Sequence, residues 1–110
     1  MALLIYSPSH AVADWAKAIQ ALAPDLDIRI DPEAGNPADI DVALVWKPPP
    51  GLLQRFFNLK LIHSFGAGVD GILADPNIPK HVPLARVVDG GLTVSMAEYV
   101  LLHVLRFHRQ

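Results

Sequence analysis

The hydrophobic pattern of the first 46 residues predicts three strands and one helix. Apolar runs at residues 3–6 and 42–46 are typical of strands buried on both faces of a sheet. Residues 26–31 alternate apolar and polar side chains, a period of two that predicts an edge strand with one face in solvent. A helix is predicted over residues 11–23, and Pro24 ends it. We expect Trp15 in the core, because the apolar face of this helix comprises Val12, Trp15, Ala16, Ile19 and Leu22.

Polar and proline-rich breaks divide the remainder of the chain into further strands and helices. The sequence Pro48-Pro49-Pro50-Gly51 follows the third strand and interrupts regular structure. The pattern predicts strands at residues 59–65 and 84–88, and helical segments at residues 52–57, 66–73 and 93–108. In the last helix, Ser95 and Glu98 have the spacing of an N-terminal capping box.

The order of these elements predicts an α/β fold, because strands that alternate with helices or short crossovers form a parallel sheet. Right-handed crossovers make the flavodoxin-like order 2-1-3-4-5 the simplest arrangement of the five strands. Ligands bind such sheets outside the carboxyl ends of the strands. This rule selects four candidate segments: Ser7–His10, Trp46-Lys47, Ser64–Asp70 and Asp89–Gly91.

Composition and charge exclude several kinds of partner and chemistry. The chain has 110 residues, a length typical of one domain, and its 52% hydrophobic residues suffice for a packed core. The net charge is -2 and no block of Lys or Arg occurs, which argues against nucleic acid and anionic membranes as partners. The absence of cysteine excludes disulfides, zinc–thiolate sites and thiol catalysis. Because the sequence contains no membrane span and no signal peptide, we expect a cytoplasmic protein.

The final predicted helix is apolar around nearly its whole circumference. A helix of this kind needs burial on more than one side, and a single sheet covers only one side. Another domain or another subunit must therefore cover the rest. The sequence ends at Arg109-Gln110 without a glycine or asparagine cap, which favours a cut chain over a natural terminus. The apolar positions are Val94, Met96, Ala97, Tyr99, Val100, Leu101, Leu102, Val104, Leu105 and Phe107.

The glycine-rich segment Gly66–Gly71 permits three interpretations. It matches the G-x-G-x-x-G dinucleotide fingerprint, with Asp89 about 20 residues further on, where such sites place a ribose-binding acid. Pro76 and Pro79 argue against that interpretation, because they prevent the long helix that holds the pyrophosphate. The glycines could instead form a tight turn with positive φ angles. In the third interpretation, consecutive N–H groups of the loop bind a small carboxylate.

Residues near these segments have alternative roles. Trp46 can line a pocket at the end of its strand or pack in the core. Lys47 can attract an anionic substrate or lie in solvent. His63 is expected to make a local hydrogen bond within its strand. His10 and His81 have no partner at metal-ligand spacing, so we assign them no chemistry and expect no metal site.

One strand and its loop resemble the signature of the D-isomer-specific 2-hydroxyacid dehydrogenases: Leu59-Lys60-Leu61-Ile62-His63-Ser64-Phe65-Gly66-Ala67-Gly68-Val69-Asp70. Two further segments are similar to the glyoxylate/hydroxypyruvate reductase A branch, namely Val45-Trp46-Lys47-Pro48-Pro49 and Met96-Ala97-Glu98-Tyr99. The resemblance spans essentially the whole chain. It implies a two-domain oxidoreductase that reduces glyoxylate or hydroxypyruvate to glycolate or glycerate with NADPH or NADH. It also implies that the backbone amides of Ala67 and Gly68 bind the substrate carboxylate and that Trp46 lines the pocket.

The resemblance further implies which parts of such an enzyme this chain contains. Residues 1–91 correspond to the N-terminal part of the flavodoxin-like substrate-binding domain. Residues 92–110 correspond to the interdomain helix that helps to form a homodimer. The Rossmann NAD(P)-binding domain, with the carboxylate-binding Arg, the acidic partner and the proton-donating His, is absent from these residues. We therefore expect the fragment to contain no catalytic and no cofactor-binding residue, to bind no cofactor, and to be inactive.

A function of a different class stays open. The chain could be a stand-alone flavodoxin-like binding module that forms a homodimer through its apolar last helix. A stop codon after Gln110 would favour this module. A reading frame that continues into a second glycine-rich fingerprint would favour the enzyme, whose partner is a small 2-oxo acid.

Overall fold

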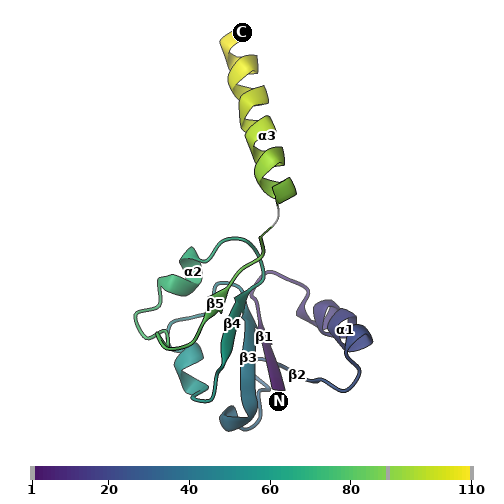
Figure 1. Ribbon diagram of the computed structural model, residues 1–110, viewed down its shortest axis with the longest axis vertical. Helices are drawn as coiled ribbons and strands as arrows, with labels where there is room; N and C mark the ends of the chain where they lie inside the picture. The colour runs from purple at the N-terminus through teal and green to yellow at the C-terminus, as the bar shows by residue number, and fades with distance from the viewer. Residues whose placement is uncertain (1, 89, 110) are drawn as a thin grey trace.

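Five parallel strands form one sheet in the computed structural model, which describes residues 2–88 and 90–109. The strands are β1 (Ala2–Tyr6), β2 (Asp27–Ile30), β3 (Ile40–Val45), β4 (Leu61–Ser64) and β5 (Leu84–Ala85). Their spatial order is β2-β1-β3-β4-β5, and every neighbouring pair is parallel (Figure 1). The predicted α/β flavodoxin-like sheet and its order 2-1-3-4-5 are confirmed.

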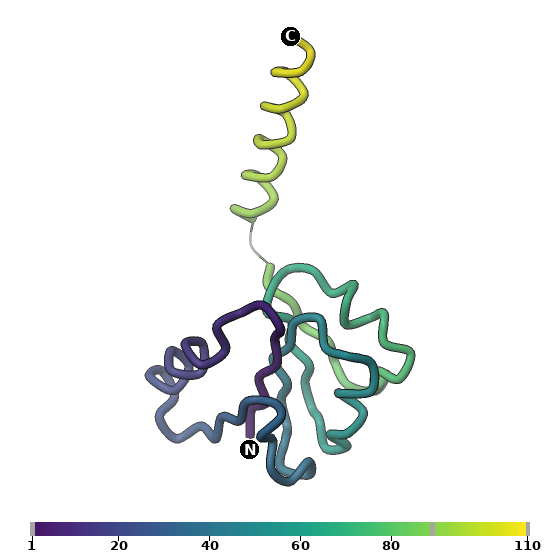
Figure 2. The backbone as a smooth tube through the Cα atoms, turned by 180° about the vertical axis from the view of Figure 1, so that it is seen from behind, coloured from purple at the N-terminus to yellow at the C-terminus, as the bar shows by residue number. Residues whose placement is uncertain are grey.

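Alternate residues of β1 lie in two cores, one on each face of the sheet. Ala2 and Leu4 pack in a core that also contains Phe56 and Ile72. Leu3 and Ile5 pack on the other face, beneath α1 (Val12–Leu22). The sheet therefore separates α1 from α2 (Asp70–Leu73), as the views from the front and from behind show (Figures 1 and 2). This alternation is what a strand buried on both faces produces.

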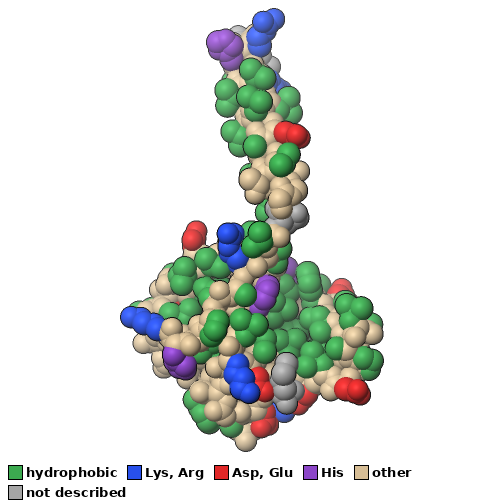
Figure 3. All heavy atoms as spheres, viewed as in Figure 1, with side chains coloured by type: hydrophobic (Ala, Val, Ile, Leu, Met, Phe, Trp, Pro, Cys, Tyr) green, Lys and Arg blue, Asp and Glu red, His purple; other side chains and the backbone are tan. Residues whose placement is uncertain are grey.

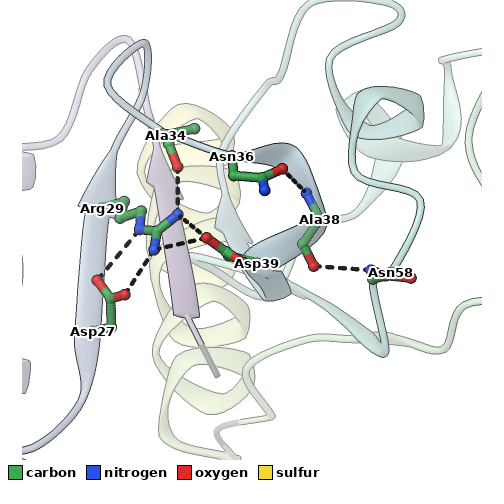
Figure 4. A network of polar contacts seen from close by, with 7 residues as sticks. All are labelled: Asp27, Arg29, Ala34, Asn36, Ala38, Asp39 and Asn58. Atoms are coloured by element: carbon green, nitrogen blue, oxygen red, sulfur yellow. Dashed lines mark hydrogen bonds and ion pairs between the residues drawn. The ribbon is translucent and has the colours of Figure 1, made fainter.

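Arg29 of β2 connects the edge strand to the turn that precedes β3. Its guanidinium donates to Asp27 at 2.8 Å, to Asp39 at 3.3 Å and to the carbonyl oxygen of Ala34 at 2.8 Å (Figure 4). The hydrogen bond to Asp27 is the largest cause that raises the pKa of Arg29 above its ordinary value. Because Asp27 begins β2 and Asp39 precedes β3, this network lies at the amino edge of the sheet, opposite the carboxyl ends.

Several predicted elements, including the following three, are shorter in the structure than the pattern suggested. The predicted helix over 52–57 is a 3₁₀ turn at Leu53–Arg55, α2 is a single turn of four residues, and β5 has two residues instead of five. The helix α2 ends at Leu73 as predicted but starts only at Asp70, because residues 66–69 form the loop that leaves β4. The strand β5 starts at Leu84 as predicted but ends at Ala85, the last of its residues that pairs with β4. The chain after β5 still runs beside the sheet, since the Val87 N–H donates to the Gly66 carbonyl oxygen at 3.1 Å.

The expectation that Trp15 lies in the core is wrong, since its side chain is 44% exposed. On a helix with 3.6 residues per turn, Val12, Ala16 and Ile19 centre the apolar stripe, and Trp15 lies about 60° to one side. Those three residues pack partly buried against the core beneath α1. Trp15 lies instead at the margin of the helix, where its ring contacts Phe65 edge-on at 5.1 Å between centroids.

Helix α3 (Gly90–Arg109) begins before the predicted start at Thr93. Ser95 and Glu98 therefore lie inside the helix, and the predicted capping box is wrong. A capping side chain satisfies N–H groups only where helical hydrogen bonding starts, and the backbone is already helical from Gly90. The candidate residues Asp89 and Gln110 lie outside the described residues.

Nothing in the described chain covers α3. The helix extends away from the sheet, and apolar side chains lie exposed along its length (Figures 1 and 3). Leu102 is 62% exposed and Phe107 is 73% exposed. The structure therefore leaves these side chains exposed, and their coverage by another domain or subunit stays a prediction. Neither α3 nor any other helix within residues 2–88 and 90–109 has the length and hydropathy to cross a membrane.

Candidate functional site

Two residues continue the sheet just beyond its central strands and bring their side chains to its carboxyl edge. The Trp46 N–H donates to the Tyr6 carbonyl oxygen at 2.9 Å, and the Phe65 N–H donates to the Val45 carbonyl oxygen at 3.0 Å. These bonds place the first residue after β3 between the chain that leaves β1 and the chain that leaves β4. Trp46 consequently lies directly beside the loop that begins at Gly66.

The glycines of this loop make room for the indole of Trp46. A Cβ atom on Gly66 would lie 3.3 Å from Trp46 Cζ3, and one on Gly68 would lie 3.8 Å from Trp46 Cη2. Neither glycine has a positive φ; among the described glycines that conformation occurs at Gly35 and Gly51. The interpretation as a positive-φ turn is therefore wrong. Close packing against Trp46 is what requires a small residue at position 66.

A cleft of about 190 Å³ opens beside Trp46. The predicted site residues Trp46 and Gly68 both line it, whereas Ala67 does not. Lys47 has a φ of 46°, a left-handed conformation that is unfavourable for a residue with a Cβ atom. Its ammonium nitrogen lies 6.0 Å from the centroid of the Trp46 ring. The other lining residues are Asp70, Gly71 and Ile72.

The backbone of the loop leaves two neighbouring N–H groups available. The Gly66 N–H donates to Ser64 Oγ at 3.2 Å, and Ser64 Oγ donates to the Gly68 carbonyl oxygen at 2.8 Å. Within the described part of the chain, the N–H groups of Ala67 and Gly68 have no hydrogen-bond acceptor. Consecutive free N–H groups of this kind bind anions. The loop can therefore accept a carboxylate.

The chain after β5 holds the outer side of the same loop. The Val87 N–H donates to the Gly66 carbonyl oxygen at 3.1 Å, and Arg86 Nη1 lies 3.5 Å from the Ala67 carbonyl oxygen. Sequence reasoning gave Arg86 no role. No local pattern signals it, because the contact joins residues 19 positions apart.

The dinucleotide interpretation of Gly66–Gly71 is contradicted by the helix that follows it. A dinucleotide fingerprint opens a long helix whose N-terminus holds the pyrophosphate. Helix α2 contains four residues and ends at Leu73. The acid that completed this interpretation, Asp89, lies outside the described residues. Gly66–Gly71 is therefore not followed by the long helix that a dinucleotide fingerprint requires.

His10, to which the sequence analysis assigned no role, packs against both Phe65 and Trp46. Its ring stacks on Phe65 at 4.5 Å between centroids and meets Trp46 edge-on at 5.8 Å. Ser7 Oγ accepts the N–H groups of Ser9 and His10, and lies 2.7 Å from His10 Nδ1. The Ser-x-x-His spacing was the sequence signal for this contact.

Two further histidines make local contacts. His63 Nδ1 lies 2.7 Å from the Ser64 carbonyl oxygen, which confirms the expected local hydrogen bond. His103 contacts Tyr99 of α3 edge-on at 4.5 Å. In the residues that the structure describes, no group of three His, Cys, Asp or Glu side chains can hold a metal ion.

Comparison with known proteins finds similarity to curated glyoxylate/hydroxypyruvate reductase A proteins. No family model matches it. It is 36% identical to glyoxylate/hydroxypyruvate reductase A of Yersinia enterocolitica and 35% identical to that of Serratia proteamaculans. Both alignments cover all of this chain and 36% of the relative. The chain thus spans about a third of the length of the curated relatives that it matches.

Solved structures agree with this similarity. A D-isomer specific 2-hydroxyacid dehydrogenase from Xanthobacter autotrophicus Py2, in complex with NADPH and MES, is 43% identical with a TM-score of 0.78. That alignment covers 96% of this chain and 35% of the neighbour. The NADPH-dependent glyoxylate/hydroxypyruvate reductase from Sinorhizobium meliloti, in complex with NADP and sulfate, is 34% identical with a TM-score of 0.72. That alignment covers 99% of this chain and 36% of the neighbour. The resemblance stated from the sequence motifs is confirmed.

Proposed function

We propose that the chain is the N-terminal, substrate-binding part of an NAD(P)H-dependent 2-hydroxyacid dehydrogenase that reduces glyoxylate or hydroxypyruvate. In this proposal residues 1–91 belong to the substrate domain, and residues 92–110 form the interdomain and dimerisation helix. The observation that carries it is the pair of free N–H groups at Ala67 and Gly68, beside Trp46 at the carboxyl edge of the sheet. The names of the similar proteins support the substrate class.

The described residues have a restricted task in such an enzyme. The N–H groups of Ala67 and Gly68 hold the carboxylate of the 2-oxo acid by hydrogen bonds to a charged acceptor, which are stronger than neutral ones. The indole of Trp46 bounds the cleft and excludes water from one side of the carbon skeleton. Together these contacts orient the acid.

The reducing cofactor must be held elsewhere, because α2 is too short to form a dinucleotide site. Proton transfer also requires a donor positioned at the reacting oxygen, and His10 is engaged with Ser7 and Phe65. We therefore expect this chain alone to bind the acid without converting it. Glyoxylate-dependent oxidation of NADPH by the purified chain would contradict that expectation.

Amide NMR of the full chain tests the binding site directly. Oxamate, a stable analogue of a small 2-oxo acid, should shift the Ala67 and Gly68 amide resonances and broaden or shift the Trp46 indole. Trp46→Ala should weaken this response, whereas Trp15→Ala, at the margin of α1, should leave it in place. Shifts confined to other residues, or no saturable shift at all, would refute the site.

A second function is favoured by α3 alone. The exposed apolar surface of this helix suits a stand-alone flavodoxin-like binding module in which a second copy covers α3. Sedimentation velocity separates the two functions. A discrete dimer over a wide concentration range supports the module. A broad, concentration-dependent series of larger species supports a domain whose α3 is normally covered by other parts of the enzyme.

A further inference from the structure

We propose that Arg86 is a positioning residue that orients the peptide between Ala67 and Gly68, so that the Gly68 N–H faces the bound anion. This inference rests on the proposed function, because the direction of that N–H matters only if an acid binds there. Arg86 itself need not touch the acid. It acts through the carbonyl group of Ala67.

The argument begins with the geometry of two successive peptide groups. A trans peptide is planar, so its C=O and N–H point in opposite directions. The Gly66 carbonyl oxygen accepts from the Val87 N–H at 3.1 Å, and the Ala67 N–H of the same peptide therefore points away from residues 86–88. The Ala67 carbonyl oxygen lies 3.5 Å from Arg86 Nη1, so the Gly68 N–H also points away from that segment.

These contacts to the carbonyl oxygens of Gly66 and Ala67 are needed because the glycines leave the backbone dihedral angles of the loop weakly constrained. Gly66 and Gly68 flank Ala67, and glycine adopts many backbone conformations at little steric penalty. If the Ala67–Gly68 peptide rotated by half a turn, a carbonyl oxygen would replace the Gly68 N–H. That oxygen would repel a carboxylate.

Each of the three carbonyl groups in the loop has a different anchor. The backbone of Val87 holds that of Gly66, and the hydroxyl of Ser64 holds that of Gly68. The Ala67 carbonyl has only the side chain of Arg86 within the described residues. The Val87 contact comes from a backbone N–H and does not depend on the side chain at that position. The Arg86 contact comes from the side chain and is lost when Arg86 is replaced.

The charge of Arg86 is important for this contact. At 3.5 Å the hydrogen bond is long, and a neutral donor would contribute little at that distance. A positively charged guanidinium also attracts the negative end of the carbonyl dipole. We therefore expect Arg86→Lys to retain most of the effect and Arg86→Met to lose it. Arg55→Met is the matched control, since Arg55 lies over Phe56, away from the loop.

The test has two measurements on the full chain. Residual dipolar couplings of the free protein report the direction of the Gly68 N–H, and a titration with sodium oxamate reports affinity. Arg86→Met should change the Gly68 coupling and leave that of Ala67 unchanged. It should weaken oxamate binding by about tenfold, the loss of one hydrogen bond to a charged group. Arg86→Lys should stay within about threefold of the unsubstituted chain, and Arg55→Met should bind equally well.

The outcomes separate this inference from the function on which it rests. If oxamate leaves the amides of the unsubstituted chain unmoved, the anion site itself is refuted. If oxamate binds but Arg86→Met binds equally well, the role of Arg86 is refuted and the anion site stands. If affinity falls while the Gly68 coupling is unchanged, Arg86 contacts the anion directly, and the positioning role is refuted.

Discussion

Replacing Gly66 with alanine should disturb Trp46 directly, because the new methyl group would lie 3.3 Å from Trp46 Cζ3. That distance is shorter than an ordinary carbon–carbon contact, so the indole or the loop must move by a few tenths of an ångström. Gly68→Ala is the matched control. Its methyl group would meet the same indole at 3.8 Å, within the normal contact range.

The expected magnitude follows from two opposing effects. Overpacking in a protein interior typically destabilises by about 1–3 kcal/mol, and a partly buried Trp46 that borders a cleft can yield, so the lower end applies. Alanine also restricts the unfolded chain, which stabilises by about 0.4–1 kcal/mol where φ is unstrained. Gly66→Ala should therefore be neutral to about 1 kcal/mol less stable, and Gly68→Ala should be about 0.5 kcal/mol more stable.

Urea unfolding followed by tryptophan fluorescence measures both free energies. A Trp15→Phe background makes Trp46 the reporter of the site, since Trp15 and Trp46 are the two tryptophans of the chain. Gly66→Ala should also shift the Trp46 emission of the folded protein and weaken oxamate binding, whereas Gly68→Ala should change the emission little. Equal stabilities of the two variants, or an unchanged emission in Gly66→Ala, would refute the packing argument.

Three further substitutions test separate features. Ser64→Ala should lower the free energy of unfolding by about 1–3 kcal/mol, because it removes the buried hydroxyl that bonds the Gly66 N–H and a loop carbonyl; urea unfolding measures this. Lys47→Gly should raise the free energy of unfolding by up to about 1 kcal/mol, because it relieves the φ of 46°. Lys60→Gly, at a position without a positive φ, should lower the free energy of unfolding. Leu102→Glu should reduce self-association in sedimentation velocity; unchanged sedimentation would mean that α3 does not mediate contacts between copies.

The sequence predicted the strands best where burial on both faces leaves a strong signal. The runs at residues 3–6 and 42–46 became β1 and β3 because central parallel strands are apolar throughout. Trp15 was misplaced because the spacing identified its helix face correctly but did not show how far across α1 the sheet reaches. The strand β5 was predicted too long because the apolar pattern included residues 86–88, which lie beyond the last residue pair between β4 and β5.

The sequence analysis placed Trp46 beside the glycine loop but did not identify why glycines occupy the loop. That Trp46 meets the Gly66 loop follows from the rule that ligand sites lie at the carboxyl ends of parallel strands. The reason for the glycines was not predictable from the sequence. A Gly-x-Gly pattern is equally compatible with a positive φ angle and with a close approach to an indole, here 3.3 Å. Arg86 and His10 contribute through contacts that only the folded sheet creates.

The loop at residues 66–68, the proposed anion site, is assembled only when three strands are in place. Ser64 at the end of β4 and Val87 beyond β5 hold its carbonyl groups, and Trp46 beyond β3 fills the space beside Gly66. An anion at this loop therefore binds the folded chain and not the unfolded one. At ten times its dissociation constant, such a ligand must stabilise the fold by about 1.4 kcal/mol. A smaller gain with oxamate would mean that the unfolded chain also binds it, and the free N–H groups of the folded loop would then not be its site.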